Sequence, residues 1–155
     1  MKKSLKPVLF FGLILLIIDQ VIKGVLTNNM ILNQSSMLIK NFLNITLVYN
    51  TGAAFSLFLG SRIFLIIIGI FAFFGILFYI KKTGITTDLE VFTYSLLIGG
   101  ILGNLVDRIF RGYVVDYLSF NIGSWYFPIF NFADACIVLS IIFIFIKMIR
   151  EDIWN

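Results

Sequence analysis

A long apolar run near the start of this 155-residue chain decides the fold: VLFFGLILLIIDQVIKGVL, residues 8–26. At a rise of about 1.5 Å per residue, a helix of this length spans a bilayer core of about 30 Å. We expect a retained membrane helix rather than a cleaved secretory signal, because the run is long and no small-x-small cleavage site follows it. Similar runs at residues 63–80, 91–108 and 132–149 predict three more membrane helices.

The composition agrees with a membrane protein. Hydrophobic residues make up 60% of the chain, against about 45–50% in an average soluble domain. There is no histidine and one cysteine, Cys136, which excludes His-dependent catalytic triads, His-ligated metal sites and an internal disulfide. We therefore expect no metal and no cofactor, and we attribute the net charge of +4 to membrane topology rather than to nucleic-acid binding.

The basic residues predict the orientation in the membrane. Those at the chain start, the 81–82 link and the chain end fall on one side: Lys2, Lys3, Lys6, Lys81, Lys82, Lys147 and Arg150. Fewer fall on the other side: Lys23, Lys40, Arg62, Arg108 and Arg111. The positive-inside rule places the first group in the cytoplasm. Both termini are then cytoplasmic, and residues 27–61 and 109–131 lie outside the membrane on the outer face.

A small β-element is expected within residues 27–61. Residues 42–49, FLNITLVY, alternate partly and are rich in β-branched and aromatic side chains, which indicates a strand. Asn50-Thr51-Gly52 then provides a turn signal. The predicted fold class is an all-α integral membrane protein, with four transmembrane helices and a small extracytoplasmic β-element, formed by residues 1–155 as a single domain.

Four acidic residues gather toward the outer side of this predicted topology: Asp19, Asp107, Asp116 and Asp134. A carboxylate within or at the edge of the apolar zone is costly and is a candidate for function. Asn131 and Asp134 share a helix face at i, i+3, as do Asn104 and Asp107, while Asp19 and Lys23 are an i, i+4 pair. Asp116 is expected in the loop between the last two helices.

Paired carboxylates support one specific chemistry. When two share a site, they do not both ionise easily, so one activates water while the other remains protonated and donates to the substrate oxygen. Structural alternatives stand beside this. For Asp107 we favour an ion pair with Arg108, for Asp19 an ion pair with Lys23, and for Asn131 a helix cap. For Asp116 a solvated loop aspartate, and for Asp134 favourable charge at a helix N-terminus, remain open alternatives.

The chain also resembles the bacterial signal peptidase II family, the lipoprotein signal peptidases. The matching segments run in order along nearly the whole chain: DQVIK (19–23), NTGAAFS (50–56), GGILGNLVDR (99–108), VVDY (114–117) and FPIFNFAD (127–134). The resemblance implies four membrane helices with an outer β-cradle and a loop over the active site. It also implies an enzyme of the bacterial cytoplasmic membrane, with its active site at the outer face.

The resemblance further implies the roles of the site residues. Asp116 and Asp134 would be the catalytic pair of an aspartic peptidase that cuts diacylglyceryl prolipoproteins before the lipidated cysteine. Globomycin would inhibit the enzyme, and membrane lipid would surround a protein that we expect to be a monomer. The residues that would contact substrate or organise the site are Asn50, Gly52, Asn104, Arg108, Asn131, Asp19 and Lys23.

Three other functions are consistent with parts of the sequence. The acids could form the proton relay of a small ion-coupled transporter, although such acids usually lie near the bilayer midplane within repeated halves. A Ser-Lys peptidase could use Lys23 as base, with Ser56 or Ser119 as nucleophile. A purely structural membrane subunit would leave the acid cluster without a purpose.

Overall fold

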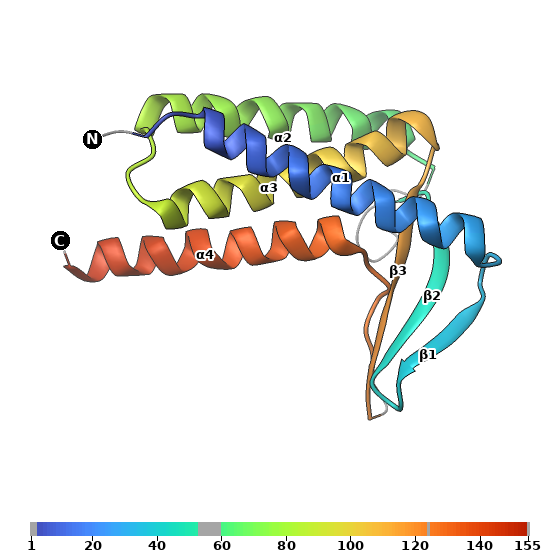
Figure 1. Cartoon of the computed structure of the whole chain (residues 1–155). Helices are drawn as coiled ribbons and strands as arrows, with labels where there is room; N and C mark the ends of the chain where they lie inside the picture. Colours follow the sequence, from blue (N-terminus) through green and yellow to red (C-terminus); the bar gives the residue numbers. More distant parts are fainter. Residues whose placement is uncertain (1–2, 53–59, 124, 155) are drawn as a thin grey trace.

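The computed structural model describes residues 3–52, 60–123 and 125–154. Within them, four helices are long and apolar enough to cross a membrane: α1 (Lys6–Asn29), α2 (Arg62–Thr83), α3 (Asp88–Phe110) and α4 (Phe132–Trp154). Each of the predicted helices is confirmed, and each extends a few residues further than the apolar run that predicted it. The helices run side by side, and the start of α1 and the end of α4 lie at the same end of the bundle (Figure 1).

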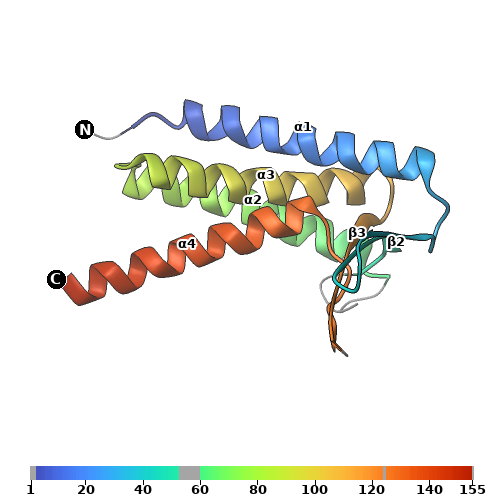
Figure 2. The ribbon, with the colours of Figure 1, turned by 60° about the horizontal axis from the view of Figure 1, so that its bottom comes forward.

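Helix α3 is the centre of the bundle. It lies between α1 and α4 (Figure 2). In its most apolar stretch of 18 residues, 67% of the residues are buried, whereas the corresponding share in the other three helices is 11–22%. It begins with a capping box, in which Thr87 Oγ1 accepts from the Glu90 amide and the Glu90 carboxylate accepts from the Thr87 amide. Helix α3 is enclosed by its neighbours, and its polar residues Thr93, Ser95, Asn104 and Asp107 are buried within the protein.

Glycines let the helices approach α3 closely. A Cβ added to Gly100 would lie 2.5 Å from the Ala133 carbonyl oxygen of α4, and one added to Gly103 would lie 2.7 Å from Asp19 Oδ2 of α1. Small residues have this role where helices pack in lipid. These close approaches fill the space between α3 and its neighbours at Gly100 and Gly103.

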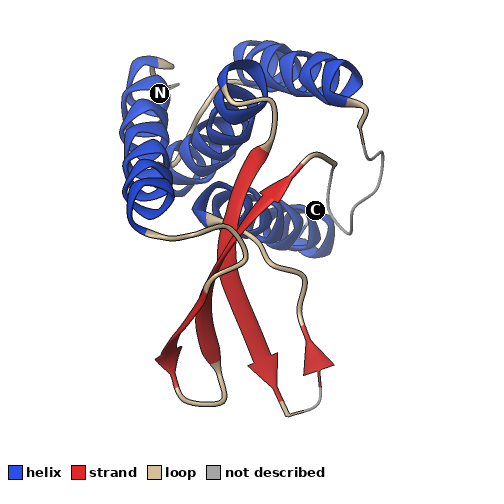
Figure 3. Cartoon of the chain, turned by 90° about the vertical axis from the view of Figure 1, so that its right-hand side faces the viewer, coloured by secondary structure: helices blue, strands red, loops and turns tan. Residues whose placement is uncertain are grey.

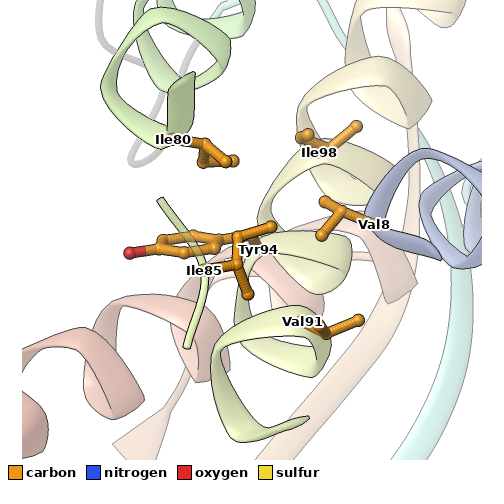
Figure 4. Close-up of a cluster of buried hydrophobic side chains, with 6 residues drawn as sticks. All are labelled: Val8, Ile80, Ile85, Val91, Tyr94 and Ile98. Carbon is orange, nitrogen blue, oxygen red and sulfur yellow. The ribbon is translucent and has the colours of Figure 1, made fainter. Parts of the chain in front are cut away.

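An apolar cluster closes the end of the bundle where α1 begins and α2 ends (Figure 4). Its buried members come from α1, α2, the α2–α3 link and α3: Val8, Ile80, Ile85, Val91, Tyr94 and Ile98. Between membrane helices such side chains attract one another by van der Waals packing, which fixes the helix ends relative to one another. The cluster anchors the end of the bundle that lies away from the sheet.

The sheet projects from the other end of the bundle (Figures 1 and 3). It is antiparallel with the order β1-β2-β3-β4, formed by β1 (Ser35–Ile39), β2 (Leu43–Asn50), β3 (Val114–Ile122) and β4 (Trp125–Tyr126). The strand predicted at residues 42–49 is confirmed as β2. In the central pair, Val48 lies opposite Asp116 and Asn50 lies opposite Val114, so β2 brings Asn50 to the same side of the sheet as Asp116.

The prediction that Asp116 lies in a loop is wrong, because Asp116 lies on strand β3. The segment VVDYLSFNI contains three polar residues that break a clean alternation, so its pattern does not indicate a strand. The segment forms a strand because it pairs with β2, which lies more than sixty residues earlier in the chain. Asp116 is therefore held on a hydrogen-bonded backbone, and its side chain is buried.

Candidate active site

Asp116 and Asp134 lie on either side of one asparagine. The Asn131 amide donates from Nδ2 to Asp116 Oδ1 over 2.7 Å, and the Asn131 backbone N–H donates to Asp134 Oδ2 over 3.2 Å. Asn131 is fully buried and Asp116 is 3% exposed. Asp116 of β3 and Asp134 of α4, the pair that the family resemblance implied, therefore share one neighbour at the sheet end of the bundle.

The start of α4 places Asp134. Asn131 precedes the first residue of α4, and its Oδ1 accepts from the Asp134 N–H over 2.9 Å. With the return bond from the Asn131 N–H to Asp134 Oδ2, this is a reciprocal cap in which Asp takes the place usually held by Glu or Gln. The predicted capping role of Asn131 is confirmed, and the same bonds orient the Asp134 carboxylate.

Two further asparagines complete the donors to the pair. Asn50 at the end of β2 donates from Nδ2 to Asp116 Oδ2 over 2.9 Å, and Asn104 of α3 donates from Nδ2 to Asp134 Oδ1 over 2.7 Å. Each carboxylate thus accepts two hydrogen bonds from neutral donors. Neutral amides orient a carboxylate without neutralising it, so the site holds two acidic groups whose charges interact directly.

The surroundings of Asp116 raise its pKa. Burial, together with the nearby negative charge of Asp134, raises the pKa of Asp116 to about 6, while the hydrogen bonds from Asn50 and Asn131 oppose the increase. Near neutral pH, a fraction of Asp116 therefore still carries a proton. A protonated and an ionised carboxyl group side by side can donate to one atom and accept from another.

A buried ion cluster lies behind the carboxylate pair. Lys23 of α1 contacts Asp19 Oδ2 and Asp107 Oδ2, each over 2.8 Å, and all three side chains are at most 1% exposed. The predicted ion pair between Asp19 and Lys23 is confirmed. Asp19 also accepts from the Ala133 N–H over 3.1 Å, which links α1 to the first turn of α4.

The predicted ion pair between Asp107 and Arg108 is wrong. Asp107 binds Lys23 and, one turn further along α3, Arg111. Adjacent residues on a helix point in directions about 100° apart, whereas residues at i, i+4 share a face. Arg108 instead donates to two carbonyl oxygens, from Nη2 to Gly52 over 3.0 Å and from Nη1 to Asn104 over 3.3 Å.

Gly52 joins this arrangement through its backbone. Its N–H donates to Asn50 Oδ1 over 2.9 Å, while its carbonyl is held by Arg108. The amide of Asn50 is therefore oriented from both sides, with its oxygen toward Gly52 and its nitrogen toward Asp116. The matched residues 53–56, including the alternative nucleophile Ser56, lie outside the described residues, as do 57–59, so the expected loop over the site stays a prediction.

Gln20 and Arg111 take part in the ion cluster although we did not nominate them as site residues. Gln20 Nε2 lies 3.1 Å from both Asp19 Oδ2 and Asp107 Oδ1, and Arg111 donates to Gln20 Oε1 over 2.7 Å. A sequence signal existed for each. Gln20 follows Asp19 within a matched segment, and Arg111 is four residues after Asp107.

The geometry does not favour the Ser-Lys alternative. Lys23 is fully buried and held as a cation between two aspartates, whereas a lysine base must lose its proton. Ser119 and Asp116 are three residues apart on β3, so they lie on opposite faces of the sheet. Among the described residues, no three His, Cys, Asp or Glu side chains gather as a metal site.

A cavity of about 450 Å³ lies between the start of α3 and the end of α4, with the ion pair of Glu90 and Lys147 on its wall. It is at the end of the bundle away from the sheet and contains neither Asp116 nor Asp134. This cavity is therefore separate from the carboxylate pair.

The chain is similar to known proteins along nearly its whole length. Residues 11–150 match the family described as signal peptidase (SPase) II. A lipoprotein signal peptidase from Staphylococcus epidermidis is 40% identical over 148 residues, which is 95% of this chain and 91% of that protein. One from Bacillus pumilus is 35% identical over 138 residues, 89% of each.

Solved structures agree with the fold. One described as a bacterial membrane enzyme at 2.3 Å resolution matches with a TM-score of 0.91 at 32% identity, and covers 97% of this chain and 92% of its own. A second, at 1.9 Å resolution, matches with a TM-score of 0.86 at 33% identity over 95% of each chain. The chain belongs to the signal peptidase II family, and it is a multi-pass membrane peptidase.

Proposed function

We propose that this peptidase removes signal peptides from diacylglyceryl-modified prolipoproteins, and that Asp116 and Asp134 are its catalytic pair. The observation that carries the aspartic mechanism is Asn131, which binds both carboxylates and so fixes them around one point. The substrate follows from the family and from its lipoprotein signal peptidases. The cut would fall just before the lipidated cysteine.

In the proposed mechanism the two acids have different roles. Asp134 lies at the N-terminus of α4, where the helix dipole favours negative charge, and it removes a proton from the attacking water. Asp116 is protonated, in keeping with its raised pKa, and it donates a hydrogen bond to the scissile carbonyl oxygen. As the tetrahedral intermediate collapses, the proton held by Asp134 passes to the leaving amine, and the C–N bond breaks.

The location of the pair suits a lipid-anchored substrate. Asp116 and Asp134 lie at the sheet end of the bundle, whereas Lys81 and Lys82 end α2 at the other end. The positive-inside rule then puts the lysine end in the cytoplasm and the pair at the outer face of the bacterial cytoplasmic membrane. A scissile bond next to a diacylglyceryl cysteine lies near that surface, because the acyl chains remain in the bilayer.

The same assignment predicts inhibition by globomycin, and we propose that the enzyme acts as a monomer. The ion-coupled transporter remains without support, because the family and its relatives are peptidases. The carboxylate pair also accounts for the acids that a purely structural subunit would leave without a purpose.

The test is cleavage of a purified diacylglyceryl-prolipoprotein by the wild type, Asp116→Asn and Asp134→Asn, each shown to be folded. Asp88→Asn is the matched control, because it makes the same chemical change on a side chain that is 95% exposed at the other end of the bundle. We expect the wild type and the control to cut before the modified cysteine, and the other two to be inactive. Near-normal activity of either site variant would refute the aspartic pair.

A further inference from the structure

Besides its ion pairs with two aspartates, Lys23 also donates a hydrogen bond to Asn104. Its ammonium group donates to Asp19 Oδ2 and Asp107 Oδ2, each over 2.8 Å, and to Asn104 Oδ1 over 3.3 Å. An ammonium has three N–H donors and no acceptor, so these three oxygens use all of its donors. The side chain is 0% exposed, and water therefore offers no substitute for any of the three.

The third contact determines how the Asn104 amide faces. Asn104 Oδ1 accepts from Lys23 and, over 3.1 Å, from Asn131 Nδ2. Because a lysine ammonium only donates, the atom that faces it must be the amide oxygen. The amide nitrogen is then turned toward Asp134, and it donates to Asp134 Oδ1 over 2.7 Å.

We propose that Lys23 is a positioning residue of the peptidase, which holds the Asn104 amide oxygen so that the amide nitrogen is presented to Asp134. The inference rests on the proposed function, since it assigns Asp134 as the base that the amide orients. Lys23 does not touch substrate, and it acts through Asn104. Helix α1, which contributes neither catalytic carboxylate, thereby controls the geometry of the catalytic base.

The positive charge of Lys23 strengthens this effect. An amide whose oxygen is bound to a cation is a better donor through its nitrogen, because hydrogen bonds in a chain polarise one another at low dielectric. Asn131 also holds Asn104 Oδ1, so loss of Lys23 weakens the orientation rather than abolishing it. The expected loss is that of about one hydrogen bond to a charged group, which corresponds to about 10- to 100-fold in rate.

A charge-balanced double variant separates positioning from the cost of a buried unpaired charge. In the cluster, Asp19 and Asp107 are opposed by Lys23 and Arg111. Lys23→Met with Asp107→Asn removes one charge of each sign. The amide oxygen introduced at position 107 still accepts from the Val115 N–H, which Asp107 binds over 3.1 Å in the wild type. Lys23→Leu with Asp107→Asn serves as the second variant if the first does not fold, since leucine also has no donor for Asn104.

The matched control is Lys147→Met with Glu90→Gln. It also removes one ion pair between membrane helices, here between α3 and α4 at the other end of the bundle, and glutamine preserves the capping box of α3. We expect both double variants to unfold at similar temperatures. We expect kcat to fall by about 10- to 100-fold in the Lys23 double variant with KM unchanged, and to stay at the wild-type value in the control.

A double-mutant cycle with Asn104→Ala tests the route. If Lys23 acts through Asn104, the loss of kcat caused by the Lys23 double substitution shrinks in the Asn104→Ala background. A folded Lys23 double variant with wild-type kcat overturns the inference, and so does an equal loss in both backgrounds. Activity in Asp116→Asn or Asp134→Asn would instead refute the proposed function, so the two failures are distinguishable.

Discussion

Asn131 and Asp134 hold each other by two reciprocal hydrogen bonds, 2.9 Å from the Asp134 N–H to Asn131 Oδ1 and 3.2 Å from the Asn131 N–H to Asp134 Oδ2. The start of α4 and the orientation of a candidate catalytic carboxylate are therefore one structural feature. Since Asn131 also donates to Asp116, its side chain sets the relative position of both acids.

Replacing Asn131 by alanine should reduce both stability and activity. The lost cap costs about 1 kcal/mol of unfolding free energy, and the lost donor to Asp116 and Asn104 should lower kcat by about tenfold or more. Thr87→Ala is the control, because it removes the side-chain cap of α3 at the other end of the bundle. If the two variants lose stability equally and also keep equal activity, Asn131 has no role beyond capping.

The pH dependence of cleavage should report the Asp116 proton. Because the mechanism needs Asp116 protonated, and its pKa is raised to about 6, the rate should fall as the pH rises above that value. The hydrogen bond from Asn50 favours the ionised form of Asp116. Asn50→Ala therefore raises the pKa of Asp116, and the alkaline limb of the pH–rate profile should move to higher pH.

Asn44→Ala is the control for this pH experiment. Asn44 lies on the same strand and is half-buried, but it pairs with Ser119, on the other face of the sheet from Asp116. Its replacement should leave the alkaline limb in place. If Asn50→Ala instead moves the acidic limb, on which activity is lost as the pH falls, Asp116 acts in its ionised form and the assigned roles of the two acids are reversed.

Gly103→Ala should destabilise the protein by about 1–3 kcal/mol through overpacking. The added Cβ would lie 2.7 Å from Asp19 Oδ2 and 3.0 Å from Ala133 Cβ, so the buried Asp19 carboxylate and Ala133 would both have to shift. Gly75→Ala on α2 is the matched control, since its Cβ would meet nothing within 4 Å. Thermal unfolding in the same detergent should separate the two, and equal unfolding temperatures would contradict the close approach at Gly103.

The helices were predictable because each is encoded by its own apolar run, and β2 was predictable because residues 42–49 carry a local alternation. Strand β3 was not, because its pairing with β2 is a contact distant in sequence and its own pattern is interrupted by Asp116, Ser119 and Asn121. Spacing alone predicted that Asn131 and Asp134 share a helix face. It could not predict that Asp116 lies beside them, because that depends on the pairing of β3 with β2. The residues alone left catalysis open for Asp116 and for Asp134, and the family resemblance implied that the two form the catalytic pair.

Partners of charged side chains were predictable only within one helix face. The i, i+4 pair of Asp19 and Lys23 is confirmed, but a neighbour in sequence was a poor guide for Asp107. That aspartate binds Lys23 of another helix, and only the packing of α1 against α3 brings them together. Asn104 illustrates the same limit, since its contacts with Lys23 and Asp134 come from α1 and α4.

Asp134 belongs to the last helix of the chain, whereas Asp19, Asn50, Asn104 and Asp116 precede it. Because a chain is synthesised from its N-terminus, a nascent molecule emerging from the ribosome contains the supporting residues before it contains the second acid. On the proposed mechanism, this nascent molecule cannot cut neighbouring polypeptides. It becomes active only when α4 has inserted and Asp134 has joined Asp116.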